Sequence, residues 1–520
     1  MRTEEQIIAE LKELCVQDGY LNAVAHFCLM TGYIFYSEEI GSNEVSDRYS
    51  RKNLIDTEIK TILGFAIKNG INTQEVKPVT VQSYIDQTEE LLKELHDSMG
   101  LTIRDELFSN SQSEAIPVRT PDEFPNSFFR EVIFYCGMSA HNFQFHEFAI
   151  EKYKNDNDWL QKTYGVSIQD CVTICKAISD RVLENINSTR SDKTKSSKVL
   201  TDGNFLINLF KFNLSEIAKQ SELDKNIVQS FMKLFSVDDT ERNNLFSELN
   251  DYNVIQAKPI IQISSHEYLS LDSTSLYQAI YESPFYWMMR DTGYTNIAVE
   301  NRGRFAEEFV FNKLSEIFGI NNVYKNIDIY SSPSNRLGEI DILVQYSDRI
   351  FIVQTKSKGL TLAAQKCNDN TLRGDFKKAV QDAYDQGLIC AKALLENKNY
   401  LLDSEKNRVE IKHKINDIFI ICSTSSHYPA ISVQSAHFLK YETSNIIHPP
   451  YVLDIFFFDI LCEFLNDPLY FMDFLKKRLR YIKSLRATHE HTILSYHLQH
   501  NLYFSEKYDC MSLDDDIAQD

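Results

Sequence analysis

The sequence predicts a multidomain α+β protein with a large all-α N-terminal region, an α/β core built on a mixed central sheet, and a helical C-terminal cap. Through much of residues 1–186, apolar residues recur at three- and four-residue spacing, as in amphipathic helices. Between residues 338 and 423, two alternating segments and one almost wholly apolar segment have the composition of strands. Helical spacing returns after His448-Pro449-Pro450.

Composition places the chain among ordinary globular proteins, with 520 residues, 43% hydrophobic and 25% charged. The net charge of −20 argues against a protein that coats nucleic acid uniformly, because such binding needs a basic surface. The ten cysteines form no Cys-x-x-Cys pair, and no signal peptide precedes them. No apolar run is long enough to span a bilayer. We therefore expect a reduced, cytoplasmic chain without a membrane partner.

The helical N-terminal region, residues 1–186, carries no motif that predicts chemistry. Glu4 to Val16, Ile55 to Lys68 and Val81 to Met99 are examples of its amphipathic segments. Residues 187–203 contain Ser, Thr, Lys and Asp throughout and almost nothing apolar. That composition predicts a linker or a mobile loop.

Residues 204–298 predict a small connector of helices and one hairpin. Leu214 to Val228 resembles a helix-turn-helix, a motif that can place a helix in a DNA major groove. Because its second helix carries few cations, a plain helical hairpin is the favoured interpretation. Residues 259–263 and 267–271 predict the strand pair, and an aromatic-rich helix follows at 277–289.

The core begins with a helix over 302–314, whose apolar residues follow helical spacing and whose first turn carries Glu307 and Glu308. Two β-rich segments, 338–344 and 350–356, then predict a hairpin that closes around residues 346–349.

Placing Gln345 opposite Ile350 in this hairpin sets Asp341 opposite Gln354 and Glu339 opposite Lys356. Strict alternation then predicts that these four polar side chains share one face, away from a mostly apolar set. A partly exposed ion pair between Asp341 and Lys356 is the structural alternative to a functional cluster.

These residues carry a family resemblance. Gly303-x-x-Ala306-Glu307-x-x-Val310, then Gly338-Glu339-x-Asp341, then Gln354-x-Lys356 resemble, in this order, the motifs of the PD-(D/E)XK nuclease superfamily. The Gln-x-Lys variant is similar to restriction endonucleases of the Mrr type. The resemblance covers about residues 299–435 and implies a restriction-endonuclease-like fold.

The resemblance implies a Mg²⁺ (or Mn²⁺) site for phosphodiester hydrolysis, in which carboxylate oxygens hold the ion. Asp341 is the first ligand we expect, and Glu307 matches the helix acid of the family. At the position of Gln354 the superfamily more commonly has an acid. Gln354 offers only an uncharged carbonyl oxygen, so the metal site would be weaker unless Glu307 or Glu339 supplies the missing negative charge. Lys356 is expected to hold the attacking water or to stabilise charge on the phosphate.

A basic stretch follows this hairpin. From 349 to 378 the chain has seven basic residues against two acidic ones, which predicts contacts with nucleic acid from Lys358, Lys366 and Arg373. Such a run is also typical of an ordinary solvated surface. Residues 414–423 then predict a buried strand that completes the sheet.

The C-terminal cap, residues 436–520, predicts helices over 452–465 and 469–482 and ends in an acidic tail at 514–516. The second helix ends in a cluster of Lys and Arg that suits a helix C-terminus.

The whole pattern predicts a Mg²⁺-dependent DNA endonuclease, and its Mrr-like motifs suit defence against foreign DNA. Two alternatives stay open. One is a catalytically inactive nuclease-fold module that binds nucleic acid or a protein partner, and the other is an RNase that uses the same residues. A homo-oligomer and a partner protein of a defence system fit the sequence equally.

Overall fold

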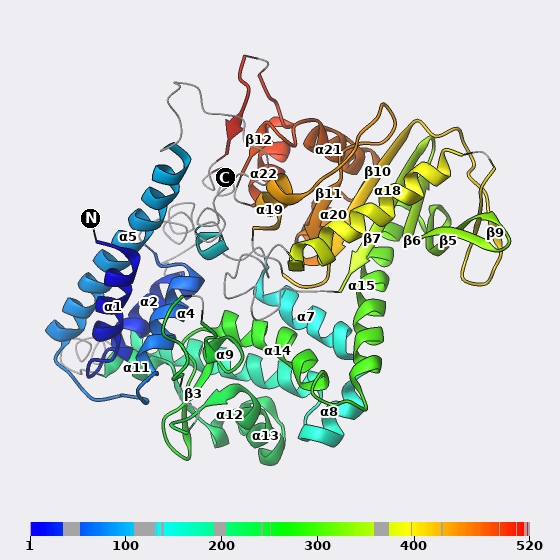
Figure 1. The fold of residues 1–520 in the computed structure, drawn as a ribbon. Helices are drawn as coiled ribbons and strands as arrows, with labels where there is room; N and C mark the ends of the chain where they lie inside the picture. Colours follow the sequence, from blue (N-terminus) through cyan, green and yellow to red (C-terminus); the bar gives the residue numbers. More distant parts are fainter. Residues whose placement is uncertain are drawn as a thin grey trace. The chain divides into compact units, whose positions relative to one another are not determined.

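The computed structural model describes residues 2–34, 53–108, 131, 133–136, 140–191, 204–240, 243–249, 251–357, 374–396, 398–427, 430–487, 489–505, 507–513 and 517. The chain divides into two compact units (Figure 1). The first comprises Met1–Glu114 and His141–Ala298, and the second comprises Ala115–Ala140 and Val299–Asp520. In the described residues, no helix has both the length and the hydropathy that a membrane crossing requires.

The first unit is mainly helical, as the sequence predicts. Its helices are α1 (Glu4–Cys15), α2 (Leu21–Gly32), α4 (Asp56–Ala66), α5 (Pro78–Phe108), α7 (Asn142–Tyr153), α8 (Asn157–Tyr164), α9 (Ile168–Ser191), α11 (Phe205–Leu209), α12 (Leu214–Ser221), α13 (Lys225–Phe235) and α14 (Ser273–Met288). Helix α9 continues five residues into the expected linker, and residues 192–203 lie outside the described part of the chain.

A small sheet accompanies these helices, with strands in the order β1-β4-β3-β2. Its strands are β1 (Lys211–Asn213), β2 (Ser236–Val237), β3 (Ile260–Gln262) and β4 (Glu267–Leu269). Strands β3 and β4 form the predicted antiparallel hairpin. Strands β1 and β2 were not predictable from the sequence, because two- and three-residue strands are too short to show a period of two. Helices α12 and α13 occupy the segment that resembles a helix-turn-helix, each with a side-chain N-cap, Asn213 and Asp224.

The second unit is built on a seven-stranded mixed sheet in the order β11-β10-β7-β6-β5-β8-β9. The strands are β5 (Val323–Ser332), β6 (Asn335–Tyr346), β7 (Arg349–Lys356), β8 (Tyr400–Leu402), β9 (Arg408–Val409), β10 (Asp417–Thr424) and β11 (Tyr451–Asp454), and β12 (Leu485–Arg486) and β13 (Met511–Ser512) form a separate pair. The helices are α15 (Thr295–Phe318), α18 (Asp382–Leu394), α19 (Ile431–Phe438), α20 (Ile455–Phe464), α21 (Pro468–Arg480) and α22 (Glu490–His500), and a π-helix at Lys377–Gln381 precedes α18.

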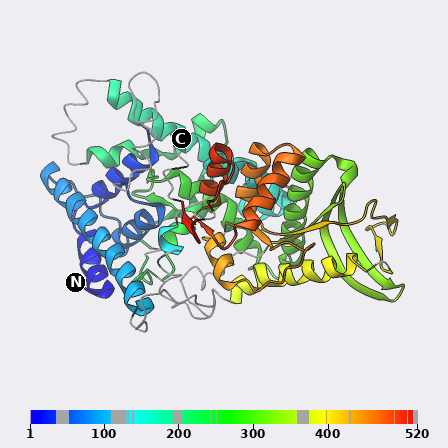
Figure 2. The same cartoon turned by 90° about the horizontal axis from the view of Figure 1, so that it is seen from above.

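Helices cover both faces of this sheet, as Figures 1 and 2 show. On one face, α18 packs over Ile352 of β7 and Ile420 of β10 within a large apolar cluster. On the other face, Phe318 at the end of α15 packs against Phe351, which also contacts Phe471 of α21. The middle residues of the central strands, for example 350–353 of β7 and 418–422 of β10, are therefore apolar and buried.

The register of the β6–β7 hairpin is the predicted one, with Gln345 opposite Ile350 and Tyr346 opposite Arg349. One prediction about the C-terminal cap is wrong. Residues Tyr451–Asp454 form strand β11, parallel to β10, and the helix expected from residue 452 begins only at Ile455. Helical spacing and a buried parallel strand are hard to distinguish in a run this apolar, so the sheet extends beyond the expected domain end at residue 435.

Candidate active site

The candidate site lies where the ladder between β6 and β7 ends. Paired residues run from Tyr346–Arg349 to Ile342–Val353, and the next row would join Asp341 to Gln354. From that row on, hydrogen bonds between side chains and the backbone take the place of the backbone pairing between the two strands. The Oδ2 atom of Asp341 accepts the backbone N–H of Thr355 at 2.7 Å, and the Nε2 atom of Gln354 donates to the carbonyl of Glu339 at 2.8 Å. The strand pair thus ends in polar side chains that are fixed by backbone groups.

The pleat of the sheet changes at this row. Lys325 of β5 lies over the ring of Phe311 on α15, whereas Ile327, two residues later, belongs to the apolar cluster under α18. Between them, Asn326 has a φ of 53°, in the left-handed region that Asn tolerates better than most residues. On β6, Ile340 and Leu343 both belong to the α18 cluster, which strict alternation forbids.

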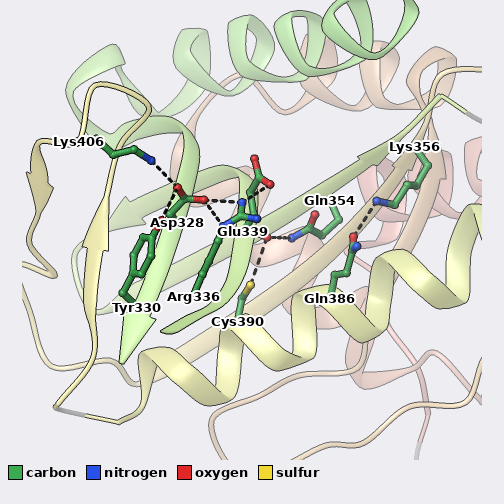
Figure 3. Close-up of polar contacts among 9 residues, drawn as sticks. All are labelled: Asp328, Tyr330, Arg336, Glu339, Gln354, Lys356, Gln386, Cys390 and Lys406. Atoms are coloured by element: carbon green, nitrogen blue, oxygen red, sulfur yellow. Dashed lines mark hydrogen bonds and ion pairs between the residues drawn. The ribbon is translucent and has the colours of Figure 1, made fainter. Parts of the chain in front are cut away.

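This change overturns the expectation that four polar side chains share one face. Gln354 and Lys356 lie on the α18 face with Ile352, but the Glu339 carboxylate points away from α18 (Figure 3). Only the carbonyl of Glu339 faces that helix, where it also accepts the Sγ–H of Cys390 at 3.3 Å. The alternation rule predicted the hairpin correctly and failed at the one row where the chemistry is expected.

Helix α15 brings Glu307 to the same end of the hairpin. The pKa of the Glu307 carboxyl is raised to about 7, mainly by burial and also by the negative charges of Asp341 and Glu339, while Lys325 and Lys356 oppose the shift. Charges influence one another in this way where water screens them incompletely. The helix acid, the strand acid and the lysine therefore share one electrostatic environment.

The surroundings of Asp341 also favour the protonated form of its carboxyl. Burial raises its pKa, and Glu339 adds to the shift, whereas the hydrogen bonds from Thr355 and the charge of Lys356 oppose it. The raised pKa values of these two half-buried carboxyls show that the nearby lysines do not fully offset burial and the neighbouring negative charges. A divalent cation bound between them would supply further positive charge.

Glu339 takes part in a separate ion-pair network, which Figure 3 shows. Its carboxylate binds Arg336, which also binds Asp328, and Lys406 reaches Asp328 at 2.9 Å. Burial opposes the ionised form of Asp328, but the ion pairs with Lys406 and Arg336 outweigh it and lower the pKa of Asp328. The Glu339 carboxylate is thus engaged by Arg336 and is not directed toward a metal site shared with Asp341 and Glu307.

The donor chemistry fits a hard divalent cation only in part. Asp341 and Glu307 offer carboxylate oxygens and Gln354 a carbonyl oxygen, the atoms that Mg²⁺ prefers, with waters completing its shell. Across the described ranges, however, no three His, Cys, Asp or Glu side chains are arranged to hold a metal ion. The expected set with Glu339 as a third carboxylate is therefore not assembled, because Arg336 binds that carboxylate.

The expected nucleic-acid contacts Lys358, Lys366 and Arg373 lie outside the described residues. Three residues that sequence reasoning did not assign to the site do contact it: Gln386, Thr355 and Arg336. Gln386 was visible as a polar residue on a helix that follows the hairpin, but nothing in the sequence fixed its partner.

Comparison with known proteins gives a family match over the part of the chain that holds the candidate site. Residues 302–416 match the family model described as NERD, nuclease-related domain. The match includes Glu307, Glu339, Asp341, Gln354 and Lys356, and it supports a nuclease-related domain with a PD-(D/E)XK-like fold. No curated protein and no solved structure matches the chain.

Proposed function

We propose that this protein is a metal-dependent endonuclease that hydrolyses phosphodiester bonds of DNA. The observation that supports this function best is the common electrostatic environment of Glu307, Asp341 and Lys356, inside the segment matched as nuclease-related. Two partly buried carboxyls with raised pKa values, both influenced by the charge of one lysine, suit a site for a cation and a phosphate.

In this proposal, Asp341 and Glu307 would hold Mg²⁺ or Mn²⁺. When bound, the ion polarises the scissile phosphate and lowers the pKa of a water molecule. Lys356 contributes a compact positive charge that stabilises the phosphate oxygens as negative charge develops on them. The hydrogen bond from Thr355 fixes the Asp341 carboxylate, so that its other oxygen is presented in one orientation.

Plasmid cleavage tests the proposal. Supercoiled DNA is incubated with the full chain in Mg²⁺, in Mn²⁺ and in EDTA, and nicked and linear products are measured. Asp341→Ala should abolish cleavage and Lys356→Ala should leave only a small residual rate, whereas Asp348→Ala and Lys398→Ala, at the hairpin turn and on an exposed loop, should leave cleavage intact. Equal cleavage by Asp341→Ala and the parent protein would refute the assigned site.

The nucleic acid and the biological role need separate tests. Because DNA and RNA present the same phosphodiester to these residues, single- and double-stranded forms of both are offered to the same preparation. A role in defence against foreign DNA predicts that expression of the parent protein, but not of Asp341→Ala, lowers plasmid transformation or phage plating.

An inactive nuclease-fold module is the second candidate, and one observation favours it. Gln354 is buried, and its amide is used in a bond to the backbone, as in a purely structural residue. Titration calorimetry separates the two functions, since a binding module has no reason to take up Mg²⁺ at Asp341. Heat of Mg²⁺ binding that disappears in Asp341→Ala supports the enzyme.

A further inference from the structure

The amine of Lys356 has a defined partner on the neighbouring helix. Its Nζ atom donates a hydrogen bond to Oε1 of Gln386 at 2.8 Å (Figure 3). Lys356 is the last residue of β7 and is half-buried, and Gln386 lies on the exposed side of α18. The contact therefore joins the carboxyl end of a central strand to a helix that covers the sheet.

Helix α18 is held firmly at this point. A Cβ atom on Gly387 would lie 2.7 Å from Cγ2 of Ile420 and 3.7 Å from Cγ of Gln354, so the helix approaches β10 and β7 as closely as a glycine permits. One turn later, Cys390 donates to the carbonyl of Glu339 on β6. These contacts fix the backbone of residue 386 against three strands.

A neutral acceptor has a specific consequence for a lysine. The lysine side chain has four rotatable carbon bonds, and an amine that acts on a phosphate must be held within a fraction of an ångström. A carboxylate partner would hold it too but would cancel much of its charge. An amide oxygen orients the ammonium group and leaves the full positive charge available.

The contact differs from that of the other glutamine on this part of the chain. Gln381 bonds the backbone N–H and carbonyl of Lys440, both at 2.9 Å, and so fixes a loop. Gln386 bonds a charged side chain, the ammonium group of Lys356, whose positive charge lowers the pKa values of Asp341 and Glu307. Its side chain is exposed and contributes nothing to the apolar cluster under α18.

We infer that Gln386 is a positioning residue that holds the Lys356 ammonium toward the scissile phosphate. This inference rests on the proposed nuclease function. Gln386 itself neither touches the reacting atoms nor binds the ion; it narrows the positions that the lysine samples.

Steady-state cleavage of a fluorescent DNA duplex by the full chain tests the inference. Gln386→Leu should lower kcat about 10- to 100-fold, the range expected for misplacement of a catalytic group by roughly an ångström. KM should stay unchanged, because Gln386 makes no contact with the DNA. In the Lys356→Ala background the same substitution should have no further effect, since the two residues act as one unit.

A second readout needs neither metal nor DNA. Acetylation of Lys356 by a limiting amine-reactive reagent, followed by mass spectrometry, should be faster in Gln386→Leu, because the amine loses its hydrogen bond. Gln386→Ala repeats each measurement without a bulky apolar side chain. Gln161→Leu, the same exchange at an exposed position of helix α8, should behave as the parent in both assays.

The outcomes separate the two proposals. If the parent protein cleaves, Lys356→Ala cleaves far more slowly, and both Gln386 variants match the parent in kcat and acetylation rate, the inference fails and the nuclease function stands. Equal losses from Gln386→Leu in the parent and Lys356→Ala backgrounds also overturn it. A parent protein without any cleavage overturns both.

Discussion

The Asp341 carboxylate accepts the backbone N–H of Thr355 at 2.7 Å and lies 3.3 Å from the Thr355 hydroxyl. It takes the place of a ladder carbonyl at the point where β6 and β7 stop pairing. One oxygen of Asp341 therefore has a structural role and the other is left for chemistry. This division allows the two roles to be separated by substitution.

Asp341→Asn should keep the fold and lose the activity. The amide oxygen can still accept the Thr355 N–H, so the free energy of unfolding should change by about 1 kcal/mol or less. Without the carboxylate charge, DNA cleavage should fall at least about 100-fold, as for loss of a main electrostatic group. Urea unfolding and plasmid nicking measure the two effects. Asp341→Ala, which removes the acceptor as well, is the control and should be the less stable variant.

Glu307 gives the protein a defined dependence of stability on pH. Burial raises the pKa of this carboxyl to about 7, above the value of roughly 4.3 in an unfolded chain. Between these values the folded state binds more protons than the unfolded state, so stability falls as pH rises from about 4.5 to 7. Thermal unfolding of the metal-free protein across this range should show the fall.

Glu307→Gln is the matched variant for this measurement. It cannot ionise, so its melting temperature should decline less between pH 4.5 and 7 than that of the parent. Identical slopes for the two proteins would show that Glu307 does not titrate in this window. Saturating Mg²⁺ should flatten the slope of the parent near pH 7, because bound cation favours the ionised carboxyl.

Arg336 should weaken cation binding by holding Glu339 and by adding positive charge near the site. Both side chains are largely exposed, so Arg336→Ala should change the free energy of unfolding by less than about 1 kcal/mol. A change of up to about 1 kcal/mol in the binding free energy corresponds to a rise of up to about fivefold in the affinity for Mg²⁺, which calorimetry measures. Arg304→Ala, which removes an exposed ion pair with Glu300 on α15, should leave the affinity unchanged.

Gly387→Ala should disturb the contact between α18 and the sheet. The added Cβ would lie 2.7 Å from Ile420, and overpacking of this kind costs about 1–3 kcal/mol. Gly100→Ala, at a helical position of α5 with open space around it, should instead stabilise by roughly 0.5–1 kcal/mol. Urea unfolding of both variants gives the comparison, and a neutral Gly387→Ala would show that α18 can shift without cost.

Sequence reasoning was most successful where local rules decide a whole element. The amphipathic helices follow from their apolar spacing, and the register of β6 against β7 follows from closing the short turn at residues 346–349, which fixes every later pair. Strand β11 was mistaken for the start of a helix, because an apolar run of this kind lacks a period of its own.

The site itself departs from the pattern. The change of pleat at Asn326 and between Ile340 and Leu343 moves Glu339 off the expected face, and a backbone dihedral of this kind leaves little trace in composition. The partnership of Gln386 with Lys356 was equally hidden, since the two residues are 30 positions apart and depend on how α18 packs. Local chemistry could be predicted, whereas its geometry required the tertiary structure.

The Glu339 carbonyl, which receives both the Gln354 amide and the Cys390 thiol, limits how this site can be re-engineered. A Gln354→Glu substitution would replace the amide donor with a second acceptor, so two oxygens would face each other without a proton between them. Such a variant needs a compensating donor nearby, because the added ligand charge alone would leave the end of the strand without this hydrogen bond.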